Sequence, residues 1–62
     1  MNPTQIEHVL SLIDVNIDDS MKRLHPEIVA YMTDHINALA SQIAEKGSAE
    51  IPTSLGSLTI SK

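Results

Sequence analysis

The sequence predicts a small, mainly α-helical protein, with a two-helix hairpin over residues 1–47 and a short β-like tail over residues 48–62. Two observations predict this fold class. Apolar residues recur every three or four positions along two long stretches, which is the spacing of one helix face. After Gly47 the chain becomes rich in Ser and Thr, and apolar and polar residues alternate as in a half-buried strand. No linker divides the chain, so the tail is expected to belong to the same single domain.

The first helix is predicted from about residue 5 to residue 24. Its apolar positions form one stripe: Ile6, Leu10, Ile13, Ile17, Met21 and Leu24. His25 precedes Pro26, and the residue before a proline is disfavoured in the α region, which ends the helix. Residues 14–20 are mostly β-branched, Asx or Ser, all of which form helices poorly. The helix is therefore either continuous or broken near residues 14–18.

The second helix is predicted from about residue 26 to residue 46. Pro26 suits the first helical position, where a missing amide proton costs nothing. Lys46 and Gly47 are typical of a helix end, with a cation in the last turn and a left-handed cap. Between them runs a seam with heptad spacing, formed by Val29, Met32, Ile36, Leu39 and Ile43.

The tail carries one clear strand signal, the alternating segment Leu58–Ser61. Within this chain the only candidate partner is the short run Glu50-Ile51, which Pro52 confines to a sheet edge. Three arrangements remain open. The tail pairs with the tail of another subunit, forms an internal hairpin that turns at Thr53–Gly56, or is mobile.

Size and composition favour self-association. A chain of 62 residues with a single aromatic residue has little apolar surface with which to offset the entropy of folding. We therefore expect a dimer or higher homo-oligomer. The expected interface comprises the seam and the strand: Val29, Met32, Ile36, Leu39, Ile43, Leu58 and Ile60. The absence of cysteine excludes a disulfide framework and a cysteine-ligated metal site.

The charge excludes further classes. A net charge of −4 opposes the phosphate backbone of DNA or RNA, so nucleic-acid binding is disfavoured. No apolar run is long enough to span a membrane, and the N-terminal residues lack the features of a signal peptide. A soluble cytoplasmic protein is expected.

No motif predicts catalysis or a cofactor. Asp14-x-Asn16-x-Asp18 matches the start of a calcium loop, but Asp19 and His25 occupy the positions that require Gly and Glu. The three histidines lack the i, i+4 spacing of a helical zinc site. Neither a Gly-x-Ser-x-Gly elbow nor a Gly-rich phosphate loop occurs. We expect no enzyme, no metal and no cofactor.

The leading interpretation is a small acidic, non-catalytic protein-interaction module that self-associates and binds or inhibits a protein partner, as a regulator or inhibitor does. An acidic surface suits a basic partner face. The alternative is an oligomeric small-ligand binder with an anion or nucleotide pocket at the helix–helix corner, formed by Lys22, Arg23, His25 and Tyr31. The simpler reading of Lys22 and Arg23 is that they complete the last turn of the first helix.

Overall fold

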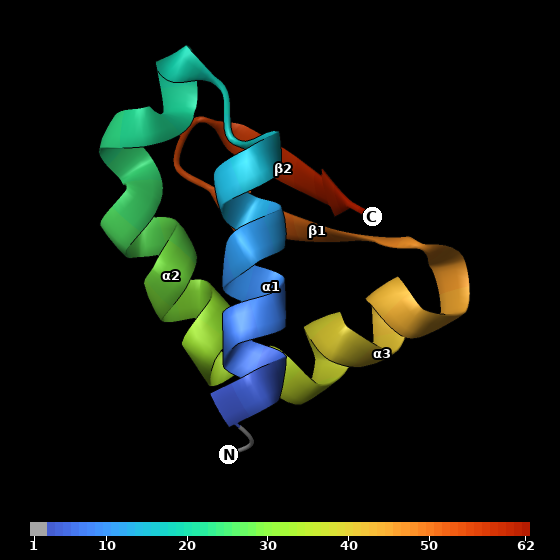
Figure 1. Ribbon diagram of the computed structural model, residues 1–62. Coiled ribbons are helices and arrows are strands. Elements are labelled where there is room, and N and C mark those ends of the chain that lie inside the picture. The colour runs from blue at the N-terminus through green and yellow to red at the C-terminus, as the bar shows by residue number, and fades with distance from the viewer. Residues whose placement is uncertain (1–2) are drawn as a thin grey trace.

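The computed structural model describes residues 3–62, in which helical segments are followed by two strands (Figure 1). In chain order these are α1 (Pro3–Asn16), the 3-10 helix η1 (Asp19–Leu24), α2 (His25–Asp34), α3 (Ile36–Lys46), β1 (Ser48–Thr53) and β2 (Gly56–Ser61). The mainly α prediction agrees with this structure. The two-helix hairpin is wrong, because the described chain has three α-helices and a two-stranded antiparallel sheet.

The predicted helix over residues 5–24 is broken, which was the second of its two alternatives. α1 ends at Asn16, and the chain resumes as η1 after Asp18. The Asp18 carboxylate caps η1, because its Oδ1 accepts a hydrogen bond from the Met21 backbone N–H over 3.1 Å. The run of poor helix formers therefore acts as the helix break and cap that its side chains favour.

The predicted helix over residues 26–46 is interrupted at His35, whose φ of −125° and ψ of 26° leave the helical region. Thr33 Oγ1 donates to the Val29 carbonyl over 2.9 Å, a type of bond that often bends helices. The His35 N–H bonds to the carbonyls of Tyr31 and Met32, at 3.0 and 3.3 Å. The interruption lets α2 and α3 take different directions (Figure 1), so that one chain covers its own core.

The tail is an internal hairpin, the second of the three alternatives, and its strands pair with each other and not with the tail of another subunit as the first alternative had it. β1 and β2 pair antiparallel, with Ala49 opposite Ile60 and Ile51 opposite Leu58. The turn is the two residues between Thr53 and Gly56, and Gly56 has a φ of 113°, which a glycine adopts without strain. The first strand is longer than Glu50-Ile51, because its pairing extends back to Ser48.

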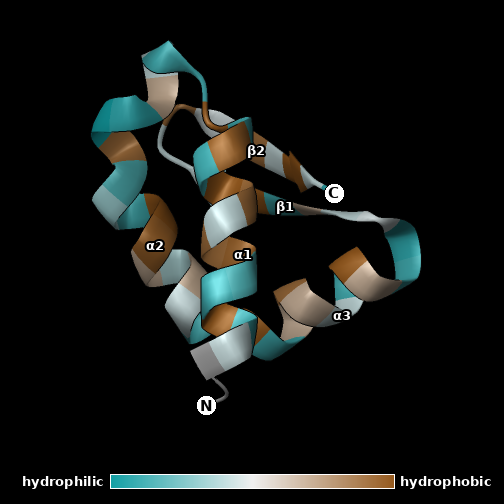
Figure 2. Cartoon of the chain, viewed as in Figure 1, coloured by the Kyte–Doolittle hydropathy of each residue, from teal (hydrophilic) through white to brown (hydrophobic). Residues whose placement is uncertain are grey.

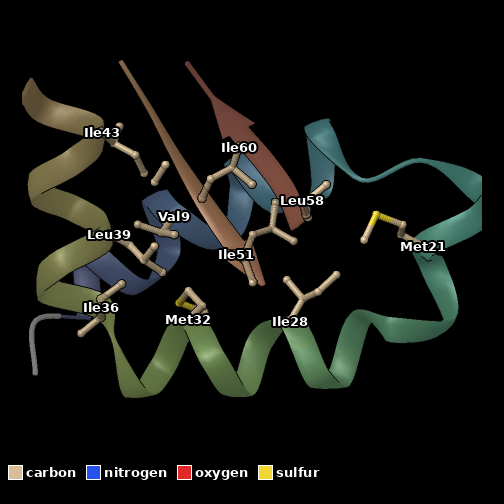
Figure 3. Close-up of a cluster of buried hydrophobic side chains, with 12 residues drawn as sticks. Val9, Met21, Ile28, Met32, Ile36, Leu39, Ile43, Ile51, Leu58 and Ile60 are labelled. Carbon is tan, nitrogen blue, oxygen red and sulfur yellow. The ribbon is translucent and has the colours of Figure 1, made fainter. Parts of the chain in front are cut away.

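The helices cover one face of the hairpin. α1 packs against β2, and α2 and α3 pack against β1. Apolar side chains from the helices and the inner sheet face meet in one core (Figure 3), and the apolar segments of the chain alternate with polar ones along each element (Figure 2). The buried side chains are those of Val9, Ile13, Met21, Ile28, Met32, Ile36, Leu39, Ile43, Ala49, Ile51, Leu58 and Ile60.

The expected interface residues lie in this core. Val29 is only partly buried and packs against the core, whereas the other six are buried within the chain itself. The heptad spacing therefore identified residues that are buried. Their side chains, however, pack against the β-hairpin of the same chain. Among the helices of residues 3–62, none has the length and apolar character needed to cross a membrane.

Candidate interaction surface

The hairpin has two outer edges, and its register shows which backbone groups face them. The Lys62 N–H donates to the Gly47 carbonyl over 3.0 Å, so Gly47 and Lys62 are a hydrogen-bonded pair of the antiparallel ladder. Bonded and non-bonded pairs alternate along an antiparallel ladder. The pairs Ser48–Ser61, Glu50–Thr59 and Pro52–Ser57 are therefore non-bonded, and their N–H and C=O groups point outward. These residues define the β1 edge (Ser48, Glu50, Pro52) and the β2 edge (Ser57, Thr59, Ser61).

The β1 edge is poorly suited to accept another strand. Pro52 has no N–H to donate, and Glu50 places an exposed negative charge beside the unpaired backbone. Proline and charge are two of the devices by which proteins keep sheet edges from pairing. Beside this edge, between β1 and the end of α3, lies a shallow depression of about 300 Å³ lined by Gln42, Lys46, Ser48, Ala49 and Glu50.

The β2 edge carries neither proline nor charge. Its three side chains, those of Ser57, Thr59 and Ser61, are small and exposed. Within residues 3–62, no hydrogen bond reaches the outward N–H and C=O groups of Ser57 and Thr59. These four groups are a ready template for an added strand.

Asn16 closes one end of the β2 edge. Its Nδ2 donates to the Ser61 carbonyl over 2.9 Å, and the Ser61 hydroxyl donates to Asn16 Oδ1 over 3.3 Å. The same Nδ2 donates to the Leu12 carbonyl over 2.8 Å, which fixes the amide against α1. The open part of the edge is therefore limited to Ser57 and Thr59.

Glu27 holds the other end of the hairpin. Its Oε1 accepts from the Ser54 backbone N–H over 3.0 Å, and its Oε2 accepts from the Ser54 hydroxyl over 3.3 Å. α2 thus anchors the turn while α1 anchors the end of β2. A strand edge that is held at both ends is already ordered, so it loses less conformational entropy when another strand pairs with it.

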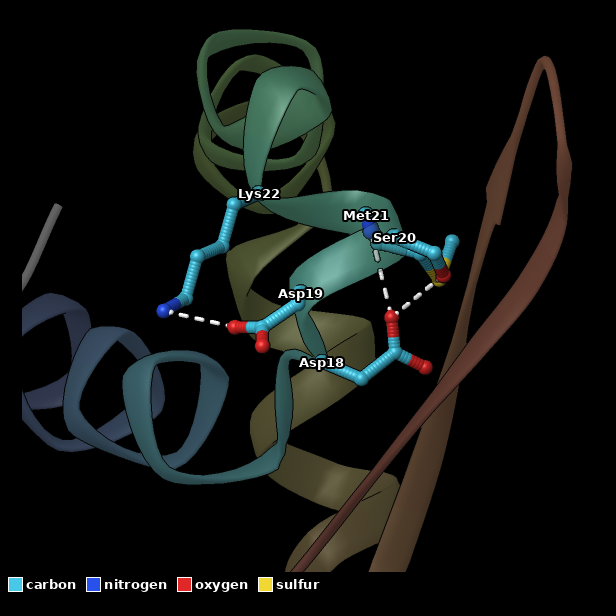
Figure 4. A network of polar contacts seen from close by, with 5 residues as sticks. All are labelled: Asp18, Asp19, Ser20, Met21 and Lys22. Carbon is cyan, nitrogen blue, oxygen red and sulfur yellow. Dashed lines mark hydrogen bonds and ion pairs between the residues drawn. The ribbon is translucent and has the colours of Figure 1, made fainter.

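The four residues of the predicted anion corner are not brought together into one pocket. Lys22 Nζ pairs with Asp19 Oδ1 at 2.8 Å (Figure 4), and His25 Nε2 lies 3.1 Å from Asp14 Oδ1. The Tyr31 ring stacks on His35, with 4.0 Å between ring centroids. Arg23 is exposed.

The helix start that was expected to bind the anion is not free. η1 runs directly into α2, and the His25 N–H donates to the Lys22 carbonyl. The depression beside β1 includes none of the four residues. The geometry therefore gives the anion pocket no support.

The three residues of the calcium-loop-like pattern, Asp14, Asn16 and Asp18, also face different partners. Asp14 faces His25, and Asn16 faces Ser61. Asp18 instead accepts from the Ser20 hydroxyl over 2.6 Å and from the Met21 N–H (Figure 4). In the part of the chain that the structure describes, no group of three His, Cys, Asp or Glu residues could hold a metal ion.

The cap on η1 lowers the pKa of Asp18. The Ser20 hydroxyl is the largest cause, and the backbone N–H groups of Met21 and Ser20 add to it, because all three bond to the charged carboxylate. This carboxylate is exposed, so its effect is local to the start of η1.

Sequence reasoning missed Asn16 and Glu27 as anchors of the hairpin. Their partners, Ser61 and Ser54, are 45 and 27 residues away along the chain, so no local spacing could reveal them. Comparison of the chain with family models, with curated proteins and with solved structures gave no match.

Proposed function

We propose that this chain is a small acidic, non-catalytic protein-interaction module that self-associates and binds or inhibits a protein partner in the cytoplasm. The observation that carries the proposal is the β2 edge, where an ordered strand leaves the backbone groups of Ser57 and Thr59 unpaired. Strand addition to such an edge is a common mode of protein recognition.

The charge distribution supports a basic protein partner. All eight acidic side chains of the chain are exposed, whereas the core holds only apolar ones. This acidic surface suits a basic face on a different protein, because opposite charges steer two proteins together. Because the apolar seam is already buried within the chain, association uses the surface and not the seam.

Molar mass tests the self-association. Light scattering from micromolar to near-millimolar protein is expected to show the mass rising above 6.8 kDa towards an integral multiple. A constant 6.8 kDa over that range contradicts this part of the proposal.

Thermal shift tests the alternative anion pocket. Anything that binds only the folded state raises Tm by mass action. Inorganic phosphate and nucleoside triphosphates are expected to leave Tm unchanged beyond the effect of matched chloride. A saturable rise in Tm that the double substitution Lys22→Glu, Arg23→Glu abolishes would instead favour the anion pocket.

A further inference from the structure

We infer that the β2 edge pairs with the β2 edge of a second copy, antiparallel, so that two hairpins form one continuous four-stranded sheet. The inference rests on the proposed self-association and assigns it to a surface. Strand pairing about a two-fold axis is self-complementary, because each copy offers the same donors and acceptors.

Charge decides which edge a second copy uses. Pairing through the β1 edges would bring two Glu50 carboxylates near each other in copies that each carry a charge of −4. It would also leave the Pro52 position without a donor. Pairing through the β2 edges brings together Ser57 and Thr59, which are uncharged and small.

Asn16 decides the register. Its side chain occupies the outward carbonyl of Ser61, so the new ladder is confined to Ser57 and Thr59. Pairing Ser57 of one copy with Thr59 of the other satisfies every outward group of both residues. The two-fold axis then passes beside Leu58, whose buried side chain adds to the shared inner face.

This register gives one exposed apolar side chain a neighbour. Leu55 and Ser61 are each three residues from Leu58, so the axis places Leu55 of one copy opposite Ser61 of the other. Leu55 is 54% exposed in the single chain, and the pairing covers it with the end of the partner's β2.

Amide hydrogen exchange tests the pairing directly. The amides of Leu58 and Ile60 are bonded within the hairpin and are protected in a monomer or a dimer. The Ser57 and Thr59 amides have no acceptor among residues 3–62, so they are expected to exchange fast at low concentration. We expect their exchange to slow as the protein associates, while the Glu50 amide on the opposite edge stays fast.

A backbone change provides the matched test. N-methylation of Thr59, introduced by chemical synthesis of the full chain, removes an outward donor that the internal ladder does not use. It deletes two hydrogen bonds per two-fold dimer, and we expect the dimer Kd to rise roughly tenfold or more. N-methylation of Glu50, the residue opposite Thr59, removes the equivalent donor of the β1 edge and is expected to leave Kd unchanged.

The outcomes separate this inference from the proposal on which it rests. A dimer whose Thr59 amide exchanges as fast as that of Glu50, or whose Kd responds equally to the two methylations, overturns the β2 pairing and leaves self-association standing. A monomer at every concentration overturns both. Circular dichroism of each methylated chain shows whether the fold is retained. If a methylated chain is unfolded, the amide exchange of the unmodified chain is the measurement that tests the β2 pairing.

Discussion

β1 and β2 both contribute apolar side chains to the core through their inner face, but their outer edges carry different kinds of residue. Each strand contributes two buried apolar side chains to the core, Ala49 and Ile51 from β1 and Leu58 and Ile60 from β2. Their edges differ in that β1 carries Pro52 and Glu50, whereas β2 carries Ser57 and Thr59. The difference separates the positions that build the core, which face inward, from the positions through which we propose that the chain associates, which face outward.

The largest expected effect lies on the inner face, where the strands are equivalent. Ile51→Ala and Leu58→Ala each remove a buried side chain and leave a cavity, at about 2–5 kcal/mol apiece. A chain of this size has only about 3–5 kcal/mol of stability from its core, so either variant is expected to be largely unfolded. Urea denaturation followed by circular dichroism measures this, and Ser57→Ala is the exposed control on the same hairpin.

The second prediction converts the closed edge into an open one. The double substitution Glu50→Thr, Pro52→Thr restores a backbone donor and removes a charge from the β1 edge. With both edges open, each copy can pair on two sides, and the assembly is expected to grow beyond the dimer into larger species. Sedimentation velocity detects the growth. A double variant with the same molar mass as the parent would show that Pro52 and Glu50 do not protect this edge.

The local part of this fold was predictable from the sequence, and the long-range part was not. The apolar spacing identified residues that are buried, and Lys46-Gly47 correctly ended α3, where Gly47 has a φ of 79°. The alternation at Leu58–Ser61 correctly marked a strand. The interruption at His35 was missed because the heptad spacing runs through it unbroken, and spacing reports which face is apolar, not whether the axis is straight.

The candidate surface was less accessible to sequence reasoning than the fold. A period of two predicts which side chains of β2 are buried, but not which partner covers them. In the proposed anion corner, the side chains of Lys22, His25 and Tyr31 each contact a partner nearby in the chain, namely Asp19, Asp14 and His35. Helix periodicity carries no information about such side-chain pairings.

The third prediction opens the end of the β2 edge. Asn16→Ala removes the amide that bonds Ser61 and ties α1 to β2. The monomer is expected to lose about 1 kcal/mol, the usual net contribution of such hydrogen bonds. The freed Ser61 carbonyl extends the edge, so self-association is expected to be retained or strengthened. Tighter association combined with a lower Tm for the monomer would separate the two roles of Asn16.

The fourth prediction concerns the turn. Glu27→Gln replaces a charged acceptor of the Ser54 N–H and hydroxyl with a neutral one, in an exposed position. The expected loss of stability is within about 1 kcal/mol, because hydrogen bonds to exposed groups compete with water. Glu45→Gln, which removes the same charge from α3, is the matched control. Equal loss in both variants would show that net charge, not the anchor, sets the difference.

The smallest effect is a dependence on pH at the start of η1. The pKa of Asp18 is lowered by the bonds from Ser20 and Met21, so the folded state binds its proton less tightly than the unfolded state does. Its contribution to stability is therefore present above the pKa of the unfolded chain and is lost as pH falls through the lower pKa of the folded chain. The Asp18→Asn variant keeps a cap but does not titrate at this position, so the stability of the variant is expected to decline less than that of the parent over this acidic range.

NMR titration of the Met21 and Ser20 amides follows the protonation of Asp18 locally. Amide chemical shifts that do not change with pH in that range would contradict the cap as the cause of the lowered pKa. Because Asp18 lies on the helical side of the fold, the titration is expected to leave the exchange rates of Ser57 and Thr59 unchanged.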